Sequence, residues 1–437
     1  EGSPSYEAGI KISDIILSLD GIPVSDKSDE EFGKLLKGKA GTEVELKLSR
    51  NHAAEILTLS VKRKKIEIPN ISYKGMVTGD VGYLRLSEFT RDAGEDVRKT
   101  VRELKSEGAQ KIVLDLRGNP GGLLNEAVNI CNVFIPKGKK VVNTKGKTKN
   151  QSFEYNTRLD PLDLDIPLAV LINSGSASAS EIVSGVIQDY DRGVVIGQKS
   201  YGKGLVQMTK PLSYNAQLKL TTAKYYVPSG RCIQALDYSN RRPGGSVGKV
   251  SDSLKSTFKT RNGREVFDGG GVDPDVETDV VYLSSYSANL SESGLIFDYA
   301  SNYYFNHNEL SEAKSFRLTD DEYNDFLSWM KRKEFENNSL AEETIEELKK
   351  ACASDKVYKN LLNEIEALQS TVTSLKSNGS TTYKLEIKRL LEQEIVSRYY
   401  LKKGAVEASL DQDMDLKKAI EILNNKNKYI DLLASNK

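Results

Sequence analysis

Residues 173–181 read Asn-Ser-Gly-Ser-Ala-Ser-Ala-Ser-Glu. The apolar run 167–172 before them predicts a strand, and the amphipathic run 182–187 after them predicts a helix. A strand, a tight turn of small residues and a helix can present one hydroxyl at a helix N-terminus, where unpaired backbone N–H groups and the helix dipole favour negative charge. Acyl transfer needs that setting beside its nucleophile. The alternative is a serine-rich N-cap with a purely structural role.

A serine nucleophile needs a base. The two histidines, His52 and His307, are distant from residues 173–181 in the sequence and have polar neighbours. A Ser-His-Asp triad is therefore not expected, and a Ser-Lys dyad is the known variant of that arrangement.

Lys203 has the most unusual setting of the lysines, in the stretch Ser-Tyr-Gly-Lys-Gly-Leu-Val-Gln over residues 200–207. Its flanking glycines allow close backbone approach and unusual backbone angles. A lysine that acts as a base must be neutral near pH 7, and burial is what favours the uncharged amine. Gln207 could hold that amine by a hydrogen bond without adding charge. The alternative is an ordinary exposed lysine among 62 basic residues.

A third stretch, residues 114–123, reads Leu-Asp-Leu-Arg-Gly-Asn-Pro-Gly-Gly-Leu. Residues 112–116 predict a strand and residues 123–134 predict a helix. The Asn-Pro-Gly-Gly turn between them leaves backbone N–H groups unpaired at its bend, and such donors suit an oxyanion hole. The alternative is a plain strand-to-helix turn.

Together the three stretches resemble the carboxy-terminal processing peptidases, also called tail-specific proteases. The matching segments are Leu-Asp-Leu-Arg-x-Asn-Pro-Gly-Gly, Gly-Ser-Ala-Ser-Ala-Ser-Glu and Gly-Lys-Gly-x-Val-Gln, in the family's order. The resemblance implies that Ser178 is the nucleophile, Lys203 the general base and Gln207 the residue that orients the lysine.

The same resemblance implies an oxyanion hole formed by the N–H of Ala179 and a glycine of the Asn-Pro-Gly-Gly turn, either Gly121 or Gly122. Residues 221–231 and 270–275 are also similar to family segments, so the resemblance covers residues 1 to about 280. It implies cleavage of proteins near an unstructured C-terminus in the bacterial cell envelope, periplasmic or secreted, with no cofactor and no metal.

The first 63 residues resemble a PDZ module. An apolar run at 15–17 leads into an Asp-Gly turn, residues 29–36 predict a short helix, and apolar and charged residues alternate over 43–48 as in a half-buried strand. PDZ modules bind peptide C-termini by adding a strand to a sheet edge. The family's first strand and carboxylate-binding loop are expected before Glu1, and Ser13 stands where the family usually has glycine. We therefore expect a PDZ module that is incomplete at its N-terminus.

A length of 437 residues predicts about three domains. The 62 acidic and 62 basic residues balance, so no nucleic-acid partner is expected. The three cysteines, Cys131, Cys232 and Cys352, are widely spaced and give neither a metal-ligand spacing nor a disulfide framework.

The coarse layout alternates strands and helices to about residue 200, and strands dominate to about residue 230. Residues 235–265 are rich in Ser, Gly, Arg and Lys and predict a surface loop. From residue 281 the pattern becomes helical. A coiled-coil-like seam, with apolar residues alternately four and three apart, consists of Leu361, Ile365, Leu368, Val372 and Leu375.

We expect that seam to pack within an intramolecular hairpin. The alternative is an arm for self-association, for an adaptor or for guiding substrate. A break at 378–379 separates the seam from a second helical stretch at about 383–402.

Three functions compete. The first is a serine endopeptidase that uses a Ser-Lys dyad. A penicillin-recognising enzyme would use residues 200–203 as Ser-x-x-Lys on a helix, but glycines oppose a helix there and no Lys-Thr-Gly follows. A non-catalytic PDZ scaffold that holds protein tails is the remaining alternative. The expected architecture is α/β: a PDZ module at 1–63, a crotonase-like protease core at 64–280 and a helical region at 281–437, acting on protein or peptide substrates with accessible C-termini.

Overall fold

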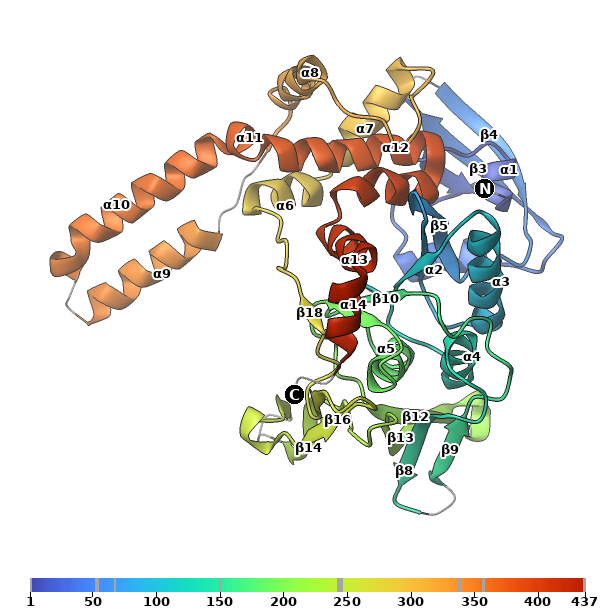
Figure 1. Cartoon of the computed structure of the whole chain (residues 1–437). Coiled ribbons are helices and arrows are strands. Elements are labelled where there is room, and N and C mark those ends of the chain that lie inside the picture. Colours follow the sequence, from blue (N-terminus) through green and yellow to red (C-terminus); the bar gives the residue numbers. More distant parts are fainter. Residues whose placement is uncertain are drawn as a thin grey trace. The chain divides into compact units, whose positions relative to one another are not determined.

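The computed structural model describes residues 2–51, 55–66, 68–148, 151–241, 247–335, 340–355 and 358–434, and Figure 1 shows their helices and strands. His52, one of the two histidines in the chain, lies outside the described residues. The chain forms two compact units: Glu1–Ile68 with Val281–Asp411, and Pro69–Val280 with Gln412–Lys437. The polypeptide therefore leaves the second unit at Val280 and returns to it at Gln412.

A six-stranded sheet forms the centre of the second unit, in the order β18-β11-β10-β7-β6-β5. Neighbouring strands from β6 to β18 pair in parallel, and β5 pairs with β6 in the antiparallel sense. The strands are β5 (Ile71–Thr78), β6 (Val81–Leu86), β7 (Lys111–Asp115), β10 (Leu168–Ile172), β11 (Val194–Gly197) and β18 (Val276–Glu277). Strand β10 is buried along its whole length, which explains its continuous apolar sequence.

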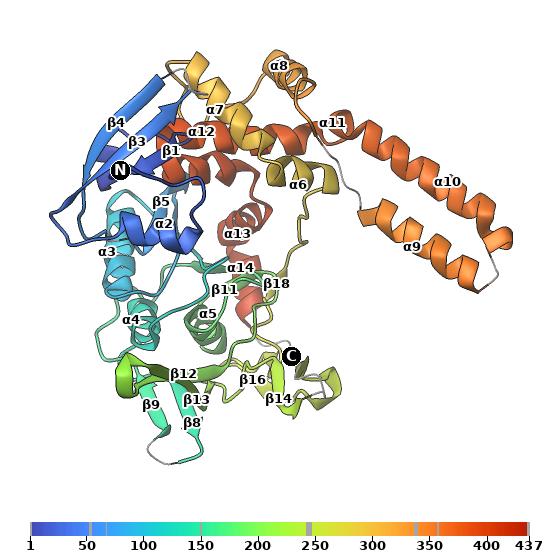
Figure 2. The same cartoon turned by 180° about the vertical axis from the view of Figure 1, so that it is seen from behind.

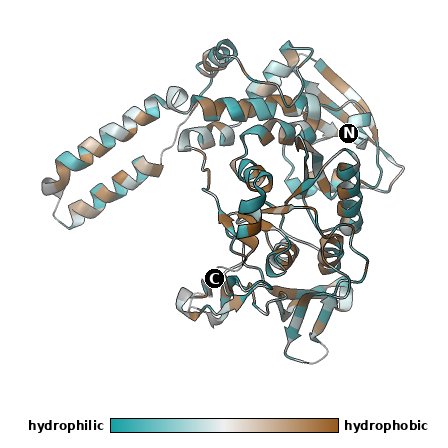
Figure 3. Ribbon diagram, in the orientation of Figure 1, coloured by the Kyte–Doolittle hydropathy of each residue, from teal (hydrophilic) through white to brown (hydrophobic). Residues whose placement is uncertain are grey.

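Three helices follow the parallel strands and lie side by side: α3 (Ala93–Ser106), α4 (Leu124–Phe134) and α5 (Ala179–Asp189). The spacing of Val97, Val101 and Leu104 predicts one buried face of α3, and all three side chains are buried. Two further helices, α13 (Met414–Asn424) and α14 (Lys426–Leu433), contact the sheet from the returning C-terminal segment. Apolar colour gathers on the central strands and on α4 and α5 (Figure 3).

A second sheet, entirely antiparallel, has the order β12-β13-β8-β9. Its strands are β8 (Lys140–Gly146), β9 (Phe153–Asn156), β12 (Leu205–Pro211) and β13 (Gln217–Tyr226). Strand β8 contacts α5, so this helix lies next to both sheets. The expected dominance of strands after residue 200 is confirmed.

The surface loop predicted for residues 235–265 is wrong in part, because two small hairpins lie within it. They are β14 (Leu236–Arg241) with β15 (Val247–Lys249), and β16 (Thr257–Lys259) with β17 (Glu265–Phe267). Strands this short, with few buried side chains, leave too little apolar alternation to detect in a segment rich in polar residues.

The N-terminal part of the first unit is a four-stranded antiparallel sheet with the order β2-β1-β3-β4. Its elements are α1 (Pro4–Glu7), β1 (Ile15–Leu19), β2 (Ile22–Pro23), α2 (Asp29–Leu36), β3 (Glu43–Arg50) and β4 (Glu55–Lys62). The alternation predicted for 43–48 is confirmed, since Val44, Leu46 and Leu48 are buried and the residues between them are exposed. The short helix predicted at 29–36 is α2, which a capping box begins.

The rest of the first unit is helical, as predicted. The helices are α6 (Ser285–Glu292), α7 (Leu295–Asn306), α8 (Asp320–Met330), α9 (Leu340–Ser354), α10 (Tyr358–Ser377), α11 (Gly379–Thr382) and α12 (Lys384–Ser409). Leu401, with φ of 56°, interrupts α12 close to the predicted end of that stretch. No helix in the described ranges is both long and apolar enough to cross a membrane.

The predicted seam lies on α10, which packs against α9 as a hairpin (Figure 2). Ile365 and Val372 pack with Ile345 and Cys352 of α9. The other seam positions, Leu361, Leu368 and Leu375, remain 40%, 47% and 48% exposed. The hairpin thus uses two of the five seam positions.

Candidate active site

Ser178 occupies the N-cap position of α5, after the tight turn that follows β10. Its φ of 56° and ψ of −109° are unusual for a residue with a side chain. Such backbone strain persists only where the surroundings enforce it, and it is common at functional sites. The neighbouring Ser176 and Ser180 are fully buried, and their hydroxyls donate to the carbonyl oxygens of Leu116 and Asn119 at 2.8 and 2.9 Å. Of these three alternate serines, Ser178 is the one that solvent reaches.

Residues 173–178 form the serine turn, which carries Ser178, and residues 198–204 form the lysine loop, which carries Lys203. The buried carboxylate of Glu181, in the first turn of α5, joins these two segments. Its Oε2 accepts hydrogen bonds from the backbone N–H of Ser178 at 2.8 Å and of Lys203 at 2.9 Å. Its Oε1 accepts from the hydroxyl of Ser200 at 2.5 Å and from the N–H of Gly202 at 2.7 Å. Burial raises the pKa of Glu181, although the four donors oppose that shift.

A buried tyrosine on β13 forms a second bridge between the same two residues. The hydroxyl of Tyr225 lies 2.6 Å from the carbonyl oxygen of Lys203 and 3.1 Å from that of Ser178. Burial raises the pKa of Tyr225 well above its usual value, and the Glu181 carboxylate adds to the shift, so the hydroxyl stays a donor. Glu181 therefore holds the N–H groups of Ser178 and Lys203, and Tyr225 holds their carbonyl groups.

The turn after β7 is bonded to the serine turn along its length. The N–H of Gly118 donates to Asn173 Oδ1 at 2.9 Å, and the N–H of Ala177 donates to the carbonyl of Asn119 at 3.0 Å. Asn119 is fully buried, and its side chain donates to the carbonyl of Leu86 at 2.8 Å. The two turns that the sequence singled out are thus side by side.

Gly121 lies directly against the serine. With φ of +99°, a Cβ there would lie 2.8 Å from both Ala179 N and Ser178 Cβ. The N–H of Gly121 donates to Asn119 Oδ1 at 2.9 Å. Within the described ranges no hydrogen bond engages the N–H of Gly122 or of Ala179. These two N–H groups therefore have no acceptor among the described residues, whereas the N–H of Gly121 has one.

The side chains of Lys203 and Gln207 are exposed. The burial expected for Lys203 is therefore wrong for this structure, in which the glycines beside it are buried while the lysine itself faces solvent. Gln207 lies early in β12, just after an irregularity in its pairing with β13. No hydrogen bond joins Gln207 to Lys203 in the part of the chain that the structure describes.

His307 is engaged elsewhere. It belongs to the first unit, its Nδ1 lies 2.9 Å from the carbonyl oxygen of Tyr303, and its ring stacks on that tyrosine at 3.9 Å between centroids. This contact accounts for the residue without a catalytic role.

Sequence reasoning placed Glu181 and Tyr225 inside family-like segments but gave neither a role. The signal for Glu181 was present, since a glutamate at the third position of a helix that begins with serine indicates a capping box. Nothing in the sequence shows that β13 returns Tyr225 to the serine turn, because that contact depends on long-range sheet pairing.

Three family models match separate parts of the chain. Residues 80–238 match "Peptidase family S41", residues 1–50 match "PDZ domain", and residues 286–423 match "Probable PDZ-protease, C-terminal helical domain".

Two relatives align over a similar length. A carboxy-terminal-processing protease of Bartonella bacilliformis is 39% identical over 240 residues, which cover 54% of this chain and 55% of the relative. A probable CtpA-like serine protease of Staphylococcus aureus is 40% identical over 235 residues, covering 53% and 46%. The alignments thus span about half the length of each relative.

Among solved structures, the photosystem II D1 C-terminal processing protease aligns with a TM-score of 0.37 and 28% identity, over 64% of this chain and 66% of that one. A putative S41 protease from Bacteroides fragilis aligns with a TM-score of 0.40 and 18% identity, over 66% and 70%.

Proposed function

Because residues 80–238 match peptidase family S41, with a PDZ-domain match before them and a PDZ-protease helical-domain match after them, we propose that this chain is a serine endopeptidase with a Ser178–Lys203 dyad. Its substrates are proteins or peptides, cleaved near accessible C-termini.

The proposed reaction is peptide-bond hydrolysis in two steps. Ser178 Oγ attacks the scissile carbonyl carbon while its proton passes to the neutral Nζ of Lys203. The carbonyl oxygen becomes an anion that accepts hydrogen bonds from the N–H groups of Ala179 and Gly122. The C–N bond then breaks, and the lysine ammonium returns the proton to the leaving amine. Water, deprotonated by Lys203, hydrolyses the acyl-enzyme and restores the Ser178 hydroxyl.

The double bridge between Ser178 and Lys203 carries this proposal. Two buried side chains, Glu181 and Tyr225, each bond to both residues, so the backbones of the nucleophile and the base are held against one another. If Ser178 only capped the helix, neither Glu181 nor Tyr225 would need to bond to Lys203. The strained backbone of Ser178 adds independent support, as do the N–H groups of Ala179 and Gly122, which have no acceptor among the described residues.

Lys203 is exposed in this structure, so we propose that its surroundings change before it acts as the base. A general base needs an uncharged amine, and burial is what favours the uncharged form. We propose that the bound substrate removes water from the Lys203 side chain and that Gln207 then holds the neutral amine. In this proposal, hydrolysis is limited to chains that fill the site.

The remaining parts of the proposal rest on the family resemblance. The PDZ domain would select chains with free C-termini by strand addition. The partly used seam of α10 is the proposed surface for self-association or an adaptor. The location would be the bacterial cell envelope, periplasmic or secreted.

The direct test is digestion of an unfolded test protein by the wild type and by Ser178→Ala. The proposal expects fragments with the wild type and none with the variant, and melting curves that match. Equal digestion by both would refute it. Binding of the test protein without digestion by either would favour the non-catalytic PDZ scaffold.

A further inference from the structure

Arg117, the second residue after β7, binds carboxylates from outside its own strand as well as Asp115. Asp115, two residues earlier and fully buried, receives hydrogen bonds from Arg117 Nε at 3.0 Å and Nη2 at 2.6 Å. That pair uses only part of the guanidinium, which has five N–H donors.

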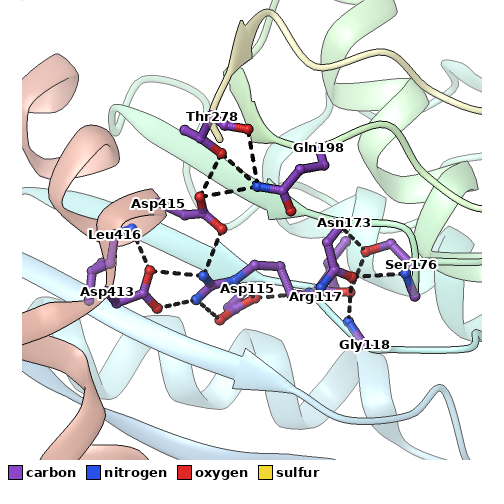
Figure 4. Close-up of polar contacts among 12 residues, drawn as sticks. Asp115, Arg117, Gly118, Asn173, Ser176, Gln198, Thr278, Asp413, Asp415 and Leu416 are labelled. Atoms are coloured by element: carbon purple, nitrogen blue, oxygen red, sulfur yellow. Dashed lines mark hydrogen bonds and ion pairs between the residues drawn. The ribbon is translucent and has the colours of Figure 1, made fainter. Parts of the chain in front are cut away.

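The remaining donors of Arg117 reach the C-terminal segment, residues 412–434. Asp413 accepts from Nη1 at 2.9 Å and from Nη2 at 2.5 Å, and Asp415 accepts from Nη1 at 2.9 Å (Figure 4). The side chains of Arg117, Asp413 and Asp415 are 15%, 16% and 11% exposed. Ion pairs this shielded from water are far less screened than surface pairs.

The same network joins the two points at which the chain leaves and re-enters this unit. Asp415 Oδ1 accepts from the hydroxyl of Thr278 at 2.6 Å, and Gln198 Nε2 donates to that hydroxyl oxygen at 2.7 Å. Thr278 precedes the exit at Val280, and Asp415 follows the return at Gln412. Segments far apart in the sequence therefore meet at Asp415, which also accepts from Arg117, the residue before the turn 118–122.

That turn positions the proposed oxyanion donor. It starts at Gly118, directly after Arg117, and its N–H groups at Gly118, Asn119 and Gly121 all have hydrogen-bond acceptors. A guanidinium held by three carboxylates fixes the end of β7 and thereby the start of the turn. Loss of the two C-terminal carboxylates would leave Arg117 a largely shielded cation with one carboxylate partner, a costly arrangement that local movement would relieve.

We infer that Asp413 and Asp415 are positioning residues for the oxyanion turn, acting through Arg117. The catalytic part of this inference rests on the proposed peptidase function. The C-terminal segment is then part of the working site, although the proposed nucleophile and base lie more than two hundred residues before it in the sequence.

The test uses the full chain and three variants. Asp413 is also the N-cap of α13 and accepts from the N–H of Leu416 at 3.0 Å, so Asp413→Ser keeps a good cap while withdrawing the carboxylate from Arg117. Asp415→Asn removes the second charge. Glu421→Gln is the matched control, because Glu421 lies on the same helix but is exposed and pairs with two lysines away from Arg117.

Two measurements decide the inference. Hydrogen exchange at Gly118, Asn119 and Gly121 should be at least tenfold faster in Asp413→Ser than in the wild type and unchanged in Glu421→Gln. With a peptide substrate, kcat should fall about tenfold while KM stays within twofold, since an oxyanion hole acts mainly in the transition state. If Asp413→Ser does not fold, Asp415→Asn is expected to give the same changes at smaller size.

A lower melting temperature with wild-type exchange in the turn would overturn the inference, because the network would then be purely structural. Unchanged kcat in the variants would also overturn it. A wild type without peptidase activity would refute the proposed function instead, and the exchange rates would still decide whether these carboxylates hold the turn.

Discussion

Replacing Glu181 by glutamine keeps the shape of the side chain and removes its charge. The carboxylate accepts four hydrogen bonds, two on each oxygen. In the amide, one oxygen becomes an NH₂ group that faces two donors, so two bonds to a charged acceptor are lost. Such bonds contribute about 1.5–3 kcal/mol each. The variant no longer buries a charge, which offsets part of that loss, so we expect a decrease of about 2–3 kcal/mol in the free energy of unfolding.

The effect on catalysis should exceed that of a general loss of stability. Ser178 and Lys203 depend on one carboxylate oxygen for the position of their backbones, and a displacement of about 1 Å at a reacting group can cost roughly 100-fold in rate. We expect kcat of Glu181→Gln to be about 10- to 100-fold below the wild type when measured well below the melting temperature. The assay is steady-state cleavage of a peptide substrate, with urea unfolding of the same preparations.

Glu126→Gln is the control for that assay. Glu126 Oε2 accepts from the N–H of Gly94 at 2.8 Å, so the variant also loses a carboxylate that binds a backbone amide, at a helix start away from the serine. It should lose stability and keep kcat. A kcat of Glu181→Gln within twofold of the wild type would refute the positioning role of Glu181, and equal losses of kcat in both variants would reduce that role to stability.

Gly121→Ala would place a Cβ 2.8 Å from Ala179 N, and its kcat should fall at least about 100-fold, as for loss of an oxyanion donor. Gly138→Ala is the control, because Gly138 has a similarly positive φ of +78° but nothing lies within 4 Å of the new Cβ. This variant should lose stability and keep its kcat. Similar kcat values for the two variants would contradict the crowding argument. Burial would raise the pKa of Asp115, but the charge and hydrogen bonds of Arg117 outweigh it and hold that pKa below its usual value. Because the folded-state pKa is lowered, Asp115 stabilises the fold above pH ~4 and loses this contribution as the pH falls through the folded value. In urea unfolding, the stability gap between the wild type and Asp115→Asn should therefore close on acidification, and a gap independent of pH would contradict the ion-pair account.

Local patterns in the sequence were enough to predict the elements that carry the site. The apolar run at 167–172 is β10, and the amphipathic run after residue 181 lies in α5. The turns at 118–122 and 173–178 lie side by side in the structure, as the family resemblance implied. Periodicity and turn chemistry act over a few residues, so a sequence reports them directly.

What the sequence did not predict depends on contacts between distant segments. The exposure of Lys203, the bridge from Tyr225 and the return of Asp413 and Asp415 to Arg117 all follow from how strands pair and where the chain re-enters its unit. The hairpins between residues 236 and 267 were missed because their strands are short and polar. Three of the five seam positions on α10 are exposed, because a heptad pattern specifies an apolar stripe but does not specify what packs against it.

The dyad is tested most directly by kcat for peptide cleavage in Ser178→Ala, Lys203→Ala and the double variant, with Lys203→Arg as the charge-preserving variant. Members of one catalytic unit are strongly non-additive, so each single variant should lose activity to about the level of the double. Lys203→Arg should be equally inactive, because arginine does not deprotonate in proteins. Near wild-type kcat in Lys203→Ala, or a double variant whose loss is the product of the two single losses, would contradict the assignment of Ser178 and Lys203 as nucleophile and base.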